Sequence, residues 1–519
     1  MALSTIYRPG VTVQSLAARP PQGGVPTDTS VGFIVGEAAQ GPDDVAAQIT
    51  SLTEFGTVFG GRLAAAPFLY DGTEAFFREG GATLYVSRLI DSTATQARIA
   101  VPALGAGVNL IANYRGTYAN GMQLVIDGPA VPPPLGEDDG EDGGDGEEEE
   151  DAPSGLTFAA KAPGDPYTAQ VLDSSGGVLQ QSLQIYTQGD LAAWLASGSY
   201  ATLAGYTDAG DLAPATVTLA AGTDGPVPVT AQAALDDALS RFLPDLGPGQ
   251  VWAPGRTTTA AQASLIVHGE LNNRVALLDA PQGADVPTLV ATASALRGSD
   301  QDRYGSMWAP WATVPGIAVG TTRTIPWSSI QAGMIARLDA STGNANRAAA
   351  GDFGQSVFAL NVTETFSDAD RQTLLFAGVN TARLRYGTVR AYGYRSLSDP
   401  NGANGQWEQF NHARLNMQIV AESEAIGEGY VFSQLDGRGL TIAAFHGELN
   451  GMLKALFDDG ALYGDTPDDA FDINTSPSVN TIATIAAGEL HAVLSVKMSP
   501  HAELVVIEIV KVVLTEALS

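Results

Sequence analysis

The feature that most constrains this chain is an apolar run close to the end of its sequence. Residues 504–514 are nearly all apolar and mostly β-branched, and the run ends five residues before Ser519. Side chains of this kind favour a pleated, buried strand. An unpaired strand exposes N–H and C=O groups that promote aggregation in water. The run therefore either completes a sheet of its own domain or adds a strand to a sheet in a neighbouring molecule.

The composition limits both the architecture and the partners. A chain of 519 residues, 45% of them hydrophobic, is long enough for roughly two to four domains with substantial cores. Its net charge is −31, and without a basic stripe such a surface repels nucleic acid and anionic membranes. The sequence has no cysteine, which removes disulfides, thiolate metal ligands and cysteine nucleophiles.

The sequence also lacks the patterns that direct a chain into or across a membrane. No apolar run reaches the ~18 residues of a membrane span. The residues around Tyr7 lack the charged and apolar regions of a signal peptide. We therefore expect synthesis in the cytoplasm and no membrane insertion.

The order of the predicted elements indicates a multidomain protein of mixed α/β class. Ser51 and Glu54 have the spacing of a capping box at a helix start. Strand and helix patterns alternate later in the chain, with one strand over Arg274–Asp279, and this alternation predicts an open α/β sheet. A helix over residues 440–457 carries apolar side chains at i, i+3 and i+4. The predicted divisions are an N-terminal extended arm (1–30), an α/β element (31–95), an inserted β-rich domain (96–225), an α/β middle domain (226–400), a C-terminal domain (401–500) and a C-terminal strand arm (501–519).

The predicted inserted domain contains a strongly acidic tract. Between Glu137 and Asp151 the sequence has eleven acidic residues and no basic one. A stretch of this charge cannot bury apolar area, so we expect a disordered surface loop over residues 136–153. An ordered calcium site is the alternative, but the spacing and the apolar position of an EF-hand loop are missing.

The sequence contains little that indicates an active site. It has no Gly-x-Ser-x-Gly elbow, no P-loop and no His-Glu-x-x-His pair. Because His-Gly-Glu-Leu-Asn occurs twice, a metal site of His268, Glu270, His446 and Glu448 is one hypothesis, and chance repetition on helix surfaces is the simpler one. Abundant carboxylates allow a glycosidase-like pair, although no motif selects two of them.

One aromatic segment has two interpretations. Tyr392, Tyr394 and Arg395 are either a binding patch or an aromatic strand within a core. Taken together, these features give only a weak signal for any enzyme. We therefore expect no catalytic residue, no bound metal and no cofactor.

Short motifs along the chain occur in an order that is typical of one family. They are Arg8-Pro9-Gly10-Val11-Thr12-Val13, Phe33-Ile34-Val35-Gly36 with Gly41-Pro42, Phe76-Phe77-Arg78-Glu79-Gly80-Gly81 with Tyr85-Val86-Ser87-Arg88, Leu278-Asp279-Ala280-Pro281, Ala309-Pro310-Trp311, Gly460-Ala461-Leu462-Tyr463-Gly464, Ala470-Phe471, Asn480, Gly488-Glu489-Leu490, and Pro500 with Ala502-Glu503. Together they resemble the contractile phage-tail sheath family, which includes the sheaths of tail-like bacteriocins and contractile injection systems. Two positions depart from the family pattern: His501 replaces a common proline, and Tyr392-Gly393-Tyr394-Arg395-Ser396 replaces Trp-Gly-x-Arg-Thr.

The resemblance implies a structural subunit without enzymatic activity. Such subunits polymerise as six-fold helical rings around an inner tail tube, and they contract from a metastable extended state to drive the tube through a target cell envelope. The implied partners are further copies of the chain, the inner tube protein, and the baseplate and tail terminator proteins of a virion tail or a similar particle.

The resemblance also assigns roles to particular residues. Arms at both ends of the chain would exchange strands with neighbouring subunits, and the candidate arm residues are Val11, Val13, Leu504, Val506, Ile507 and Ile509. The domain over residues 401–500 would face the inner tube through its helix, with Glu448 and Lys454 as candidate contacts. Two other functions remain as alternatives: a virion or surface-layer protein that does not contract, and a carbohydrate-active enzyme.

Overall fold

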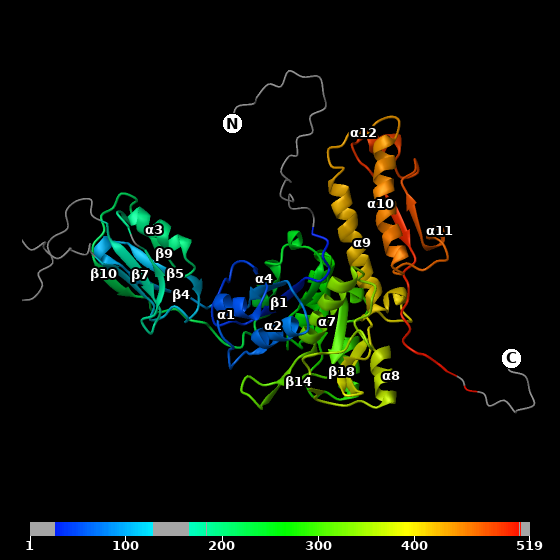
Figure 1. Cartoon of the computed structure of the whole chain (residues 1–519), viewed down its shortest axis with the longest axis horizontal. Coiled ribbons are helices and arrows are strands. Elements are labelled where there is room, and N and C mark those ends of the chain that lie inside the picture. The colour runs from blue at the N-terminus through cyan, green and yellow to red at the C-terminus, as the bar shows by residue number, and fades with distance from the viewer. Residues whose placement is uncertain (1–25, 128–165, 183, 508, 510–519) are drawn as a thin grey trace, which may run out of the picture.

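The computed structural model describes residues 26–127, 166–182, 184–507 and 509. The predicted arm residues Val11 and Val13 and the predicted loop over 136–153 lie outside these residues. In Figure 1 a β-rich unit lies at one end of the molecule, an α/β core lies in the middle, and two long helices stand at the other end. The chain is thus of the mixed α/β, multidomain class that the sequence predicts.

An eight-stranded sheet forms the centre of the α/β core. Its strand order is β18-β17-β13-β12-β11-β1-β3-β2, and only the outer pairs β2·β3 and β17·β18 are antiparallel. The central strands are buried along their whole length, as expected for parallel strands that are covered on both faces. The strands are β1 (Gly32–Gly36), β2 (Ala47–Ile49), β3 (Leu84–Arg88), β11 (Gly249–Trp252), β12 (Arg274–Asp279), β13 (Gly305–Ala309), β17 (Val379–Arg385) and β18 (Thr388–Ala391). The predicted open sheet, including the strand over Arg274–Asp279, is confirmed.

Helices cover both faces of this sheet. One face packs around Trp252, Trp308 and Trp327, and the other around Phe33 and Phe242. The helices of the core are α1 (Leu52–Phe59), α2 (Phe68–Arg78), α4 (Gln232–Ser240), α5 (Thr259–Leu271), α6 (Val286–Ser294), α7 (Trp327–Thr342) and α8 (Asp368–Phe376). A small sheet of β14 (Ala312–Pro315), β15 (Thr322–Ile325) and β16 (Asn361–Val362) lies beside them, and short 3₁₀ turns occur at Pro102–Leu104, Pro244–Leu246, Asp302–Tyr304 and Gly405–Trp407.

The predicted capping box at α1 is only half correct. The Ser51 side chain accepts a hydrogen bond from the Glu54 backbone N–H at 3.1 Å, so Ser51 is the N-cap. The Glu54 carboxylate, however, accepts from the backbone N–H of Thr50 at 2.8 Å, not from that of Ser51. The reciprocal bond is therefore displaced by one residue towards the N-terminus.

The β-rich unit has a hydrophobic core of its own. It contains two sheets, β10-β6-β7-β8 and β4-β5-β9. Its elements are β4 (Gln96–Ala100), β5 (Asn109–Arg115), β6 (Gln123–Asp127), β7 (Thr168–Leu172), β8 (Val178–Gln181), α3 (Gln188–Ser197), β9 (Ala201–Ala204) and β10 (Ala215–Thr218). Arg115 joins it to the α/β core, because its guanidinium pairs with Asp43 at 2.5 Å and its carbonyl accepts from Arg88 Nη1 at 2.8 Å.

The C-terminal part consists of a helix pair and a two-stranded sheet. In α10 (Leu440–Asp458) one stripe of apolar side chains is buried, and it packs with Leu415 and Ile419 of α9 (Phe410–Glu428). The predicted helix over 440–457 is thus confirmed. The remaining elements are α11 (Pro467–Ala470), β19 (Phe471–Asn474), α12 (Ile482–Ala486) and β20 (Val493–Val496), with β19 antiparallel to β20.

Candidate functional site

The exposed segment after Glu503 is the candidate site for assembly. Leu504, Val505, Val506, Ile507 and Ile509 are between 71% and 92% exposed. Within the described part of this segment no residue belongs to a strand. Apolar, β-branched side chains exposed in this number mark an interaction surface or an aggregation hazard. The sequence allows two roles for this run. The described residues do not adopt the first of them, which is to complete a sheet of their own domain.

The chain that leads into this segment is held by backbone hydrogen bonds. After β20 the Lys497 N–H donates to the Ala470 carbonyl at 2.8 Å, and the Lys497 carbonyl accepts from Tyr463 at 2.8 Å. Two residues later the Ser499 N–H donates to the Ala461 carbonyl at 2.9 Å. The position of the chain is therefore fixed as far as Ser499 by residues 461–470, which run from the turn after α10 to the end of α11.

Three amide side chains hold the next residues against the α/β core. Asn346 Nδ2 donates to the Ser499 carbonyl at 2.9 Å. The amide of Gln409 binds both backbone groups of His501, accepting from its N–H at 3.1 Å and donating to its carbonyl at 3.4 Å. Asn411 donates through Nδ2 to Asn346 at 2.8 Å, so its Oδ1 is the acceptor for His501 Nδ1 at 2.9 Å. That arrangement places a proton on His501 Nδ1.

An arginine–carboxylate pair ends the fixed part of the chain. Arg395 donates through Nε to Glu503 Oε1 at 3.0 Å and through Nη2 to Glu503 Oε2 at 2.5 Å, while its Nη1 donates to Glu408 at 3.0 Å. Burial opposes ionisation of Glu503, but hydrogen bonds from His501 and Arg395 outweigh it and lower the Glu503 pKa to about 2. Such two-pronged pairs fix direction as well as position. We call the contacts of residues 497–503 the arm anchor and the residues after Glu503 the C-terminal arm.

A buried network connects the arm anchor to the first described residues of the chain. Thr29 Oγ1 donates to the Asp339 carboxylate at 2.7 Å, and Arg414 pairs with the same carboxylate. Arg414 Nη1 also donates to Tyr394 Oη at 3.0 Å, and the Tyr394 ring lies 6.2 Å from that of His501. Burial alone would lower the pKa of Arg414. Asp339 and Tyr394 raise the pKa by more than burial lowers it, so the net shift is upward and the guanidinium stays charged.

Tyr392, Tyr394 and Arg395 thus separate into three environments. Tyr394 is buried in the core, in agreement with the core interpretation of this segment. Arg395 belongs to the arm anchor. Tyr392 is 39% exposed on the surface, so the three side chains do not form one binding patch.

Comparisons with known proteins identify the fold. No protein-family model matches the chain, and no curated protein matches it in sequence. A sheath tail protein from Listeria innocua superposes with a TM-score of 0.59 at 12% identity, over 89% of this chain and 90% of that one. The baseplate of the anti-feeding prophage in its contracted state gives a TM-score of 0.57 at 17% identity, over 98% and 99% of the two chains. This chain has the fold of the sheath tail proteins.

The similarity to solved sheath structures extends over the β-rich unit as well. The PVC sheath complex of an extracellular contractile injection system, in its contracted state, superposes over 98% of both chains with a TM-score of 0.53 at 13% identity. A sheath tail protein from Desulfitobacterium hafniense gives a TM-score of 0.52 at 15% identity, over 90% of this chain and 93% of that one. At such low identity the shared property is the fold.

The two candidate residues of α10 lie in different surroundings. Lys454 Nζ donates to Asp458 Oδ2 at 2.6 Å on an exposed face. Glu448 accepts from the Tyr430 hydroxyl at 2.8 Å, beside the end of α9. Both side chains are accessible, so either can contact a partner, but they do not form one cluster.

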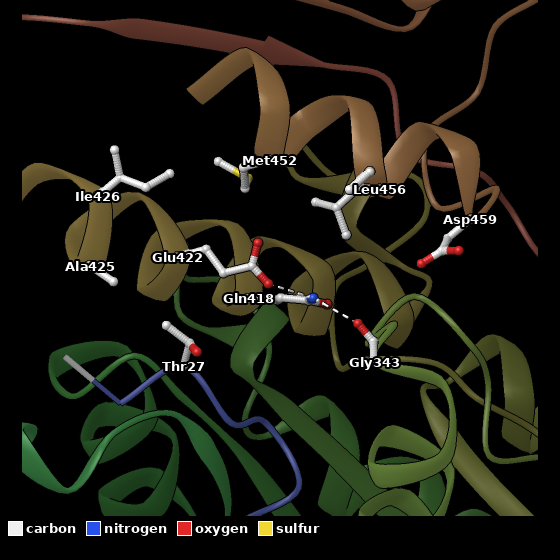
Figure 2. Close-up of a pocket in the computed structure, with 10 residues that line it drawn as sticks. Thr27, Gly343, Gln418, Glu422, Ala425, Ile426, Met452, Leu456 and Asp459 are labelled. Carbon is white, nitrogen blue, oxygen red and sulfur yellow. Dashed lines mark hydrogen bonds between the residues drawn. The ribbon is translucent and has the colours of Figure 1, made fainter. Parts of the chain in front are cut away.

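A cavity of about 340 Å³ lies between α9 and α10. Figure 2 shows Gln418 donating to Glu422 and to the Gly343 carbonyl, at 2.8 and 2.9 Å, below Met452 and Leu456. Burial raises the pKa of Glu422. Gln418, Glu422 and Gly343 thus bind one another at the wall of the cavity.

The hypothetical metal site is not formed. His268 lies in α5, 3.0 Å from Arg274 Nη1, and burial together with this arginine lowers its pKa to about 3. His446 lies in α10 and contacts Thr475 at 3.2 Å. Across the described ranges no group of three or more His, Cys, Asp or Glu side chains is arranged to hold a metal ion. Over the same ranges no helix is both long and apolar enough to cross a membrane.

Sequence reasoning did not find the anchor residues Asn346, Gln409 and Asn411, nor the Asp339–Arg414 pair. Asn411 and Arg414 are polar residues that α9 buries completely, and only the structure shows this burial. Their partners lie on other elements, so no local pattern identifies the contacts.

Proposed function

We propose that the chain is a subunit of a contractile tail sheath. In this function the subunits polymerise as six-fold helical rings around an inner tube, and they contract from a metastable extended state to drive the tube through a target cell envelope. The observation that carries the proposal is an exposed apolar arm that leaves a fixed anchor on a sheath fold. The role is structural and requires no catalytic residue.

The C-terminal arm supplies a strand to a neighbouring subunit. The described candidate residues Leu504, Val506, Ile507 and Ile509 are all exposed. About six intermolecular backbone hydrogen bonds, at roughly 0.5–1.5 kcal/mol each, contribute some 3–9 kcal/mol per subunit. Burial of the apolar side chains adds to this free energy.

The sheet of β19 and β20 is a suitable acceptor for such a strand. A two-stranded sheet is marginally stable alone, and within the described residues neither strand pairs with a third. Both outer edges therefore present unpaired backbone groups for β-augmentation. The N-terminal arm, with Val11 and Val13, has the same role in this proposal.

The exposed face of α10 contacts the inner tube. Lys454 is a candidate contact because its side chain is 53% exposed and its partner Asp458 is also exposed. Glu448, in the middle of the same helix, is a second candidate, and its carboxylate accepts a hydrogen bond from the Tyr430 hydroxyl. The baseplate and tail terminator proteins bind the two ends of the polymer.

Contraction is a rigid-body rearrangement that the arms keep connected. The arm anchor and the Asp339–Arg414 network fix where each arm leaves the subunit. Subunits can then repack between two lattices while the strand pairs stay formed, which is a recognised type of switching transition. The energy is stored at assembly, so no nucleotide is needed.

Deletion of residues 504–519 tests this function. We expect the full chain to form wide hollow tubes in electron micrographs, alone or with the tube protein, and the truncated chain to stay a folded monomer with an unchanged circular dichroism spectrum. A full chain that stays monomeric under all conditions would falsify the proposal. Tubes that keep one length with and without a baseplate would instead indicate a structural protein that does not contract.

A further inference from the structure

The hairpin of β17 and β18 has an unusual surface for so acidic a chain. Arg383, Arg385 and Arg390 extend from one face of this hairpin, and Tyr386 and Tyr392 lie between them. The guanidinium carbons lie 4.6 Å (Arg383) and 5.4 Å (Arg385) from the Tyr392 ring centroid, and 4.8 Å (Arg385) and 5.9 Å (Arg390) from that of Tyr386. We call these five residues the Arg–Tyr face. Arginine and tyrosine are the residue types most enriched at the energetic centres of protein interfaces.

The guanidinium of Arg385 is available to a partner. Its two terminal nitrogens donate to the hydroxyls of Tyr392 and Tyr386, at 2.6 and 3.0 Å, and it has no ion pair with any described carboxylate. The same hydrogen bond and charge lower the pKa of Tyr386. Arg390 pairs with Asp352, and Arg383 is 3.9 Å from Asp368, both of which are exposed carboxylates. The face therefore carries uncompensated positive charge.

The hairpin turn holds Tyr386 in a conformation that does not favour tyrosine. Tyr386 and Gly387 form a two-residue connection with φ values of +52° and +80°. Asparagine or glycine is the usual residue at the first of these positions, and a bulky side chain with positive φ is rare and strained. Tyr386 is nevertheless 81% exposed. Tyr386 thus keeps a strained backbone conformation although its ring contributes little to the core. This combination favours a role in an interaction over a role in the fold.

A complementary surface occurs elsewhere on the same chain. Residues 458–472, which we call the aspartate segment, contain six aspartates and no basic residue. Asp459, Asp465, Asp468, Asp469 and Asp472 are exposed and have no ion pair with a described residue, whereas Asp458 pairs with Lys454. Figure 1 places the segment, around α11, beside α10, and places the hairpin beside α8 in a different part of the molecule. Among the described residues, no ion pair joins the two surfaces within one subunit.

We infer that the Arg–Tyr face binds the aspartate segment of a second copy of this chain. Two different surfaces of identical subunits then meet head to tail, and such heterologous contacts generate open helical polymers or rings. Charge complementarity of this kind selects the partner and its register. The inference deepens the proposed function, on which it rests for the existence of a homopolymer, and it adds a contact that is separate from strand exchange.

A charge-exchange experiment on the full chain tests the contact. We expect Arg383→Glu with Arg385→Glu, or Asp465→Lys with Asp468→Lys, to raise the protein concentration needed for polymerisation roughly tenfold, equivalent to one lost pair of about 1.4 kcal/mol. The chain with all four changes should return towards the wild-type value. Asp208→Lys with Asp211→Lys, a matched change at exposed residues of the β-rich unit, should have no effect. Normal polymers from both reversed chains would overturn the contact and leave the proposed function intact.

Tyr386→Asn separates interaction from folding. Asparagine suits the turn, so the thermal stability of the monomer should stay the same or increase, while polymerisation weakens. Equal polymerisation by this variant would count against the interface.

Cross-linking gives an answer that does not depend on polymers. The chain has no cysteine, so Tyr386→Cys and Asp468→Cys variants can be mixed and treated with a short bismaleimide. Faster cross-linking than between Tyr386→Cys and Val178→Cys, an exposed site of the β-rich unit, would support the contact. Equal rates would overturn it, even if the wild-type chain forms no tubes.

Discussion

Thr29 donates a hydrogen bond to Asp339 at 2.7 Å, although 310 positions of sequence separate the two residues. Asp339 also pairs with Arg414, which binds the Tyr394 hydroxyl beneath His501 of the arm anchor. The first described residues and the base of the C-terminal arm therefore meet one buried network. If the proposed polymer is linked through both ends of each subunit, this network would join the two points of attachment within one subunit.

Removal of one member of the buried pair should strongly destabilise the fold. Asp339→Asn leaves the charge of Arg414 without a counter-charge in the core, and breaking such a pair costs about 3–5 kcal/mol. Chemical denaturation of the monomer measures this loss. The double variant Asp339→Asn with Arg414→Met should lose less than the two single variants together, because it leaves no buried charge. Strict additivity would show that the two residues act independently.

Loss of the Arg395–Glu503 pair should release the arm without unfolding the subunit. Glu503→Gln removes a partly exposed ion pair, so the free energy of unfolding should fall by only about 1 kcal/mol. Proteolysis after residue 497 should become faster and polymerisation weaker. Glu489→Gln, which breaks the exposed His491–Glu489 contact, is the control and should change neither. Unaltered proteolysis in Glu503→Gln would mean that the amides of Asn346, Gln409 and Asn411 suffice.

Acid should release the same anchor. The pKa of Glu503 is lowered to about 2 in the folded chain from an ordinary value of 4.5. A carboxylate with a lowered pKa contributes stability above its unfolded pKa, and this contribution is lost as the pH falls from about 4.5 towards 2. The protection factors for hydrogen exchange of residues 501–503, which are corrected for the intrinsic pH dependence of exchange, should fall over that range in the wild type. This pH-dependent loss of protection should be absent in Glu503→Gln, whereas the same dependence in both proteins would assign it to another group.

Charge reversal at Lys454 should affect partner binding more than stability. Lys454→Glu removes one exposed i,i+4 ion pair, which is worth only about 0.3–0.5 kcal/mol. If α10 contacts the inner tube, tube-templated assembly should decrease while the melting temperature barely changes. Arg78→Glu is the matched control, because Arg78 is also exposed and pairs with Glu74 at i,i+4. An equal effect of both changes would indicate a general response to net charge.

Local sequence patterns predicted the elements whose buried apolar side chains recur at a regular spacing or form an unbroken run. The helix α10 has one buried stripe, and the strand β12 contains the unbroken apolar run Val275–Leu278, so the local pattern identified both. Helix α7 had no such signal, because the four consecutive residues Trp327, Ser328, Ser329 and Ile330, which point to all sides of the helix, are all buried. A helix enclosed all round has no amphipathic pattern. The domain limits predicted from composition remain predictions.

The sequence by itself determined the local elements of this protein and the existence of an apolar terminal run, because helix and strand periodicity and β-branched side chains act over a few neighbouring residues. Only the tertiary structure decided that this run leaves the subunit exposed after Glu503, that Arg395 fixes its exit, and that three arginines interleave with two tyrosines on one hairpin face. These relationships join residues far apart in the chain, and they depend on the strand order of the sheet and the packing of its helices. No short-range pattern carries that information.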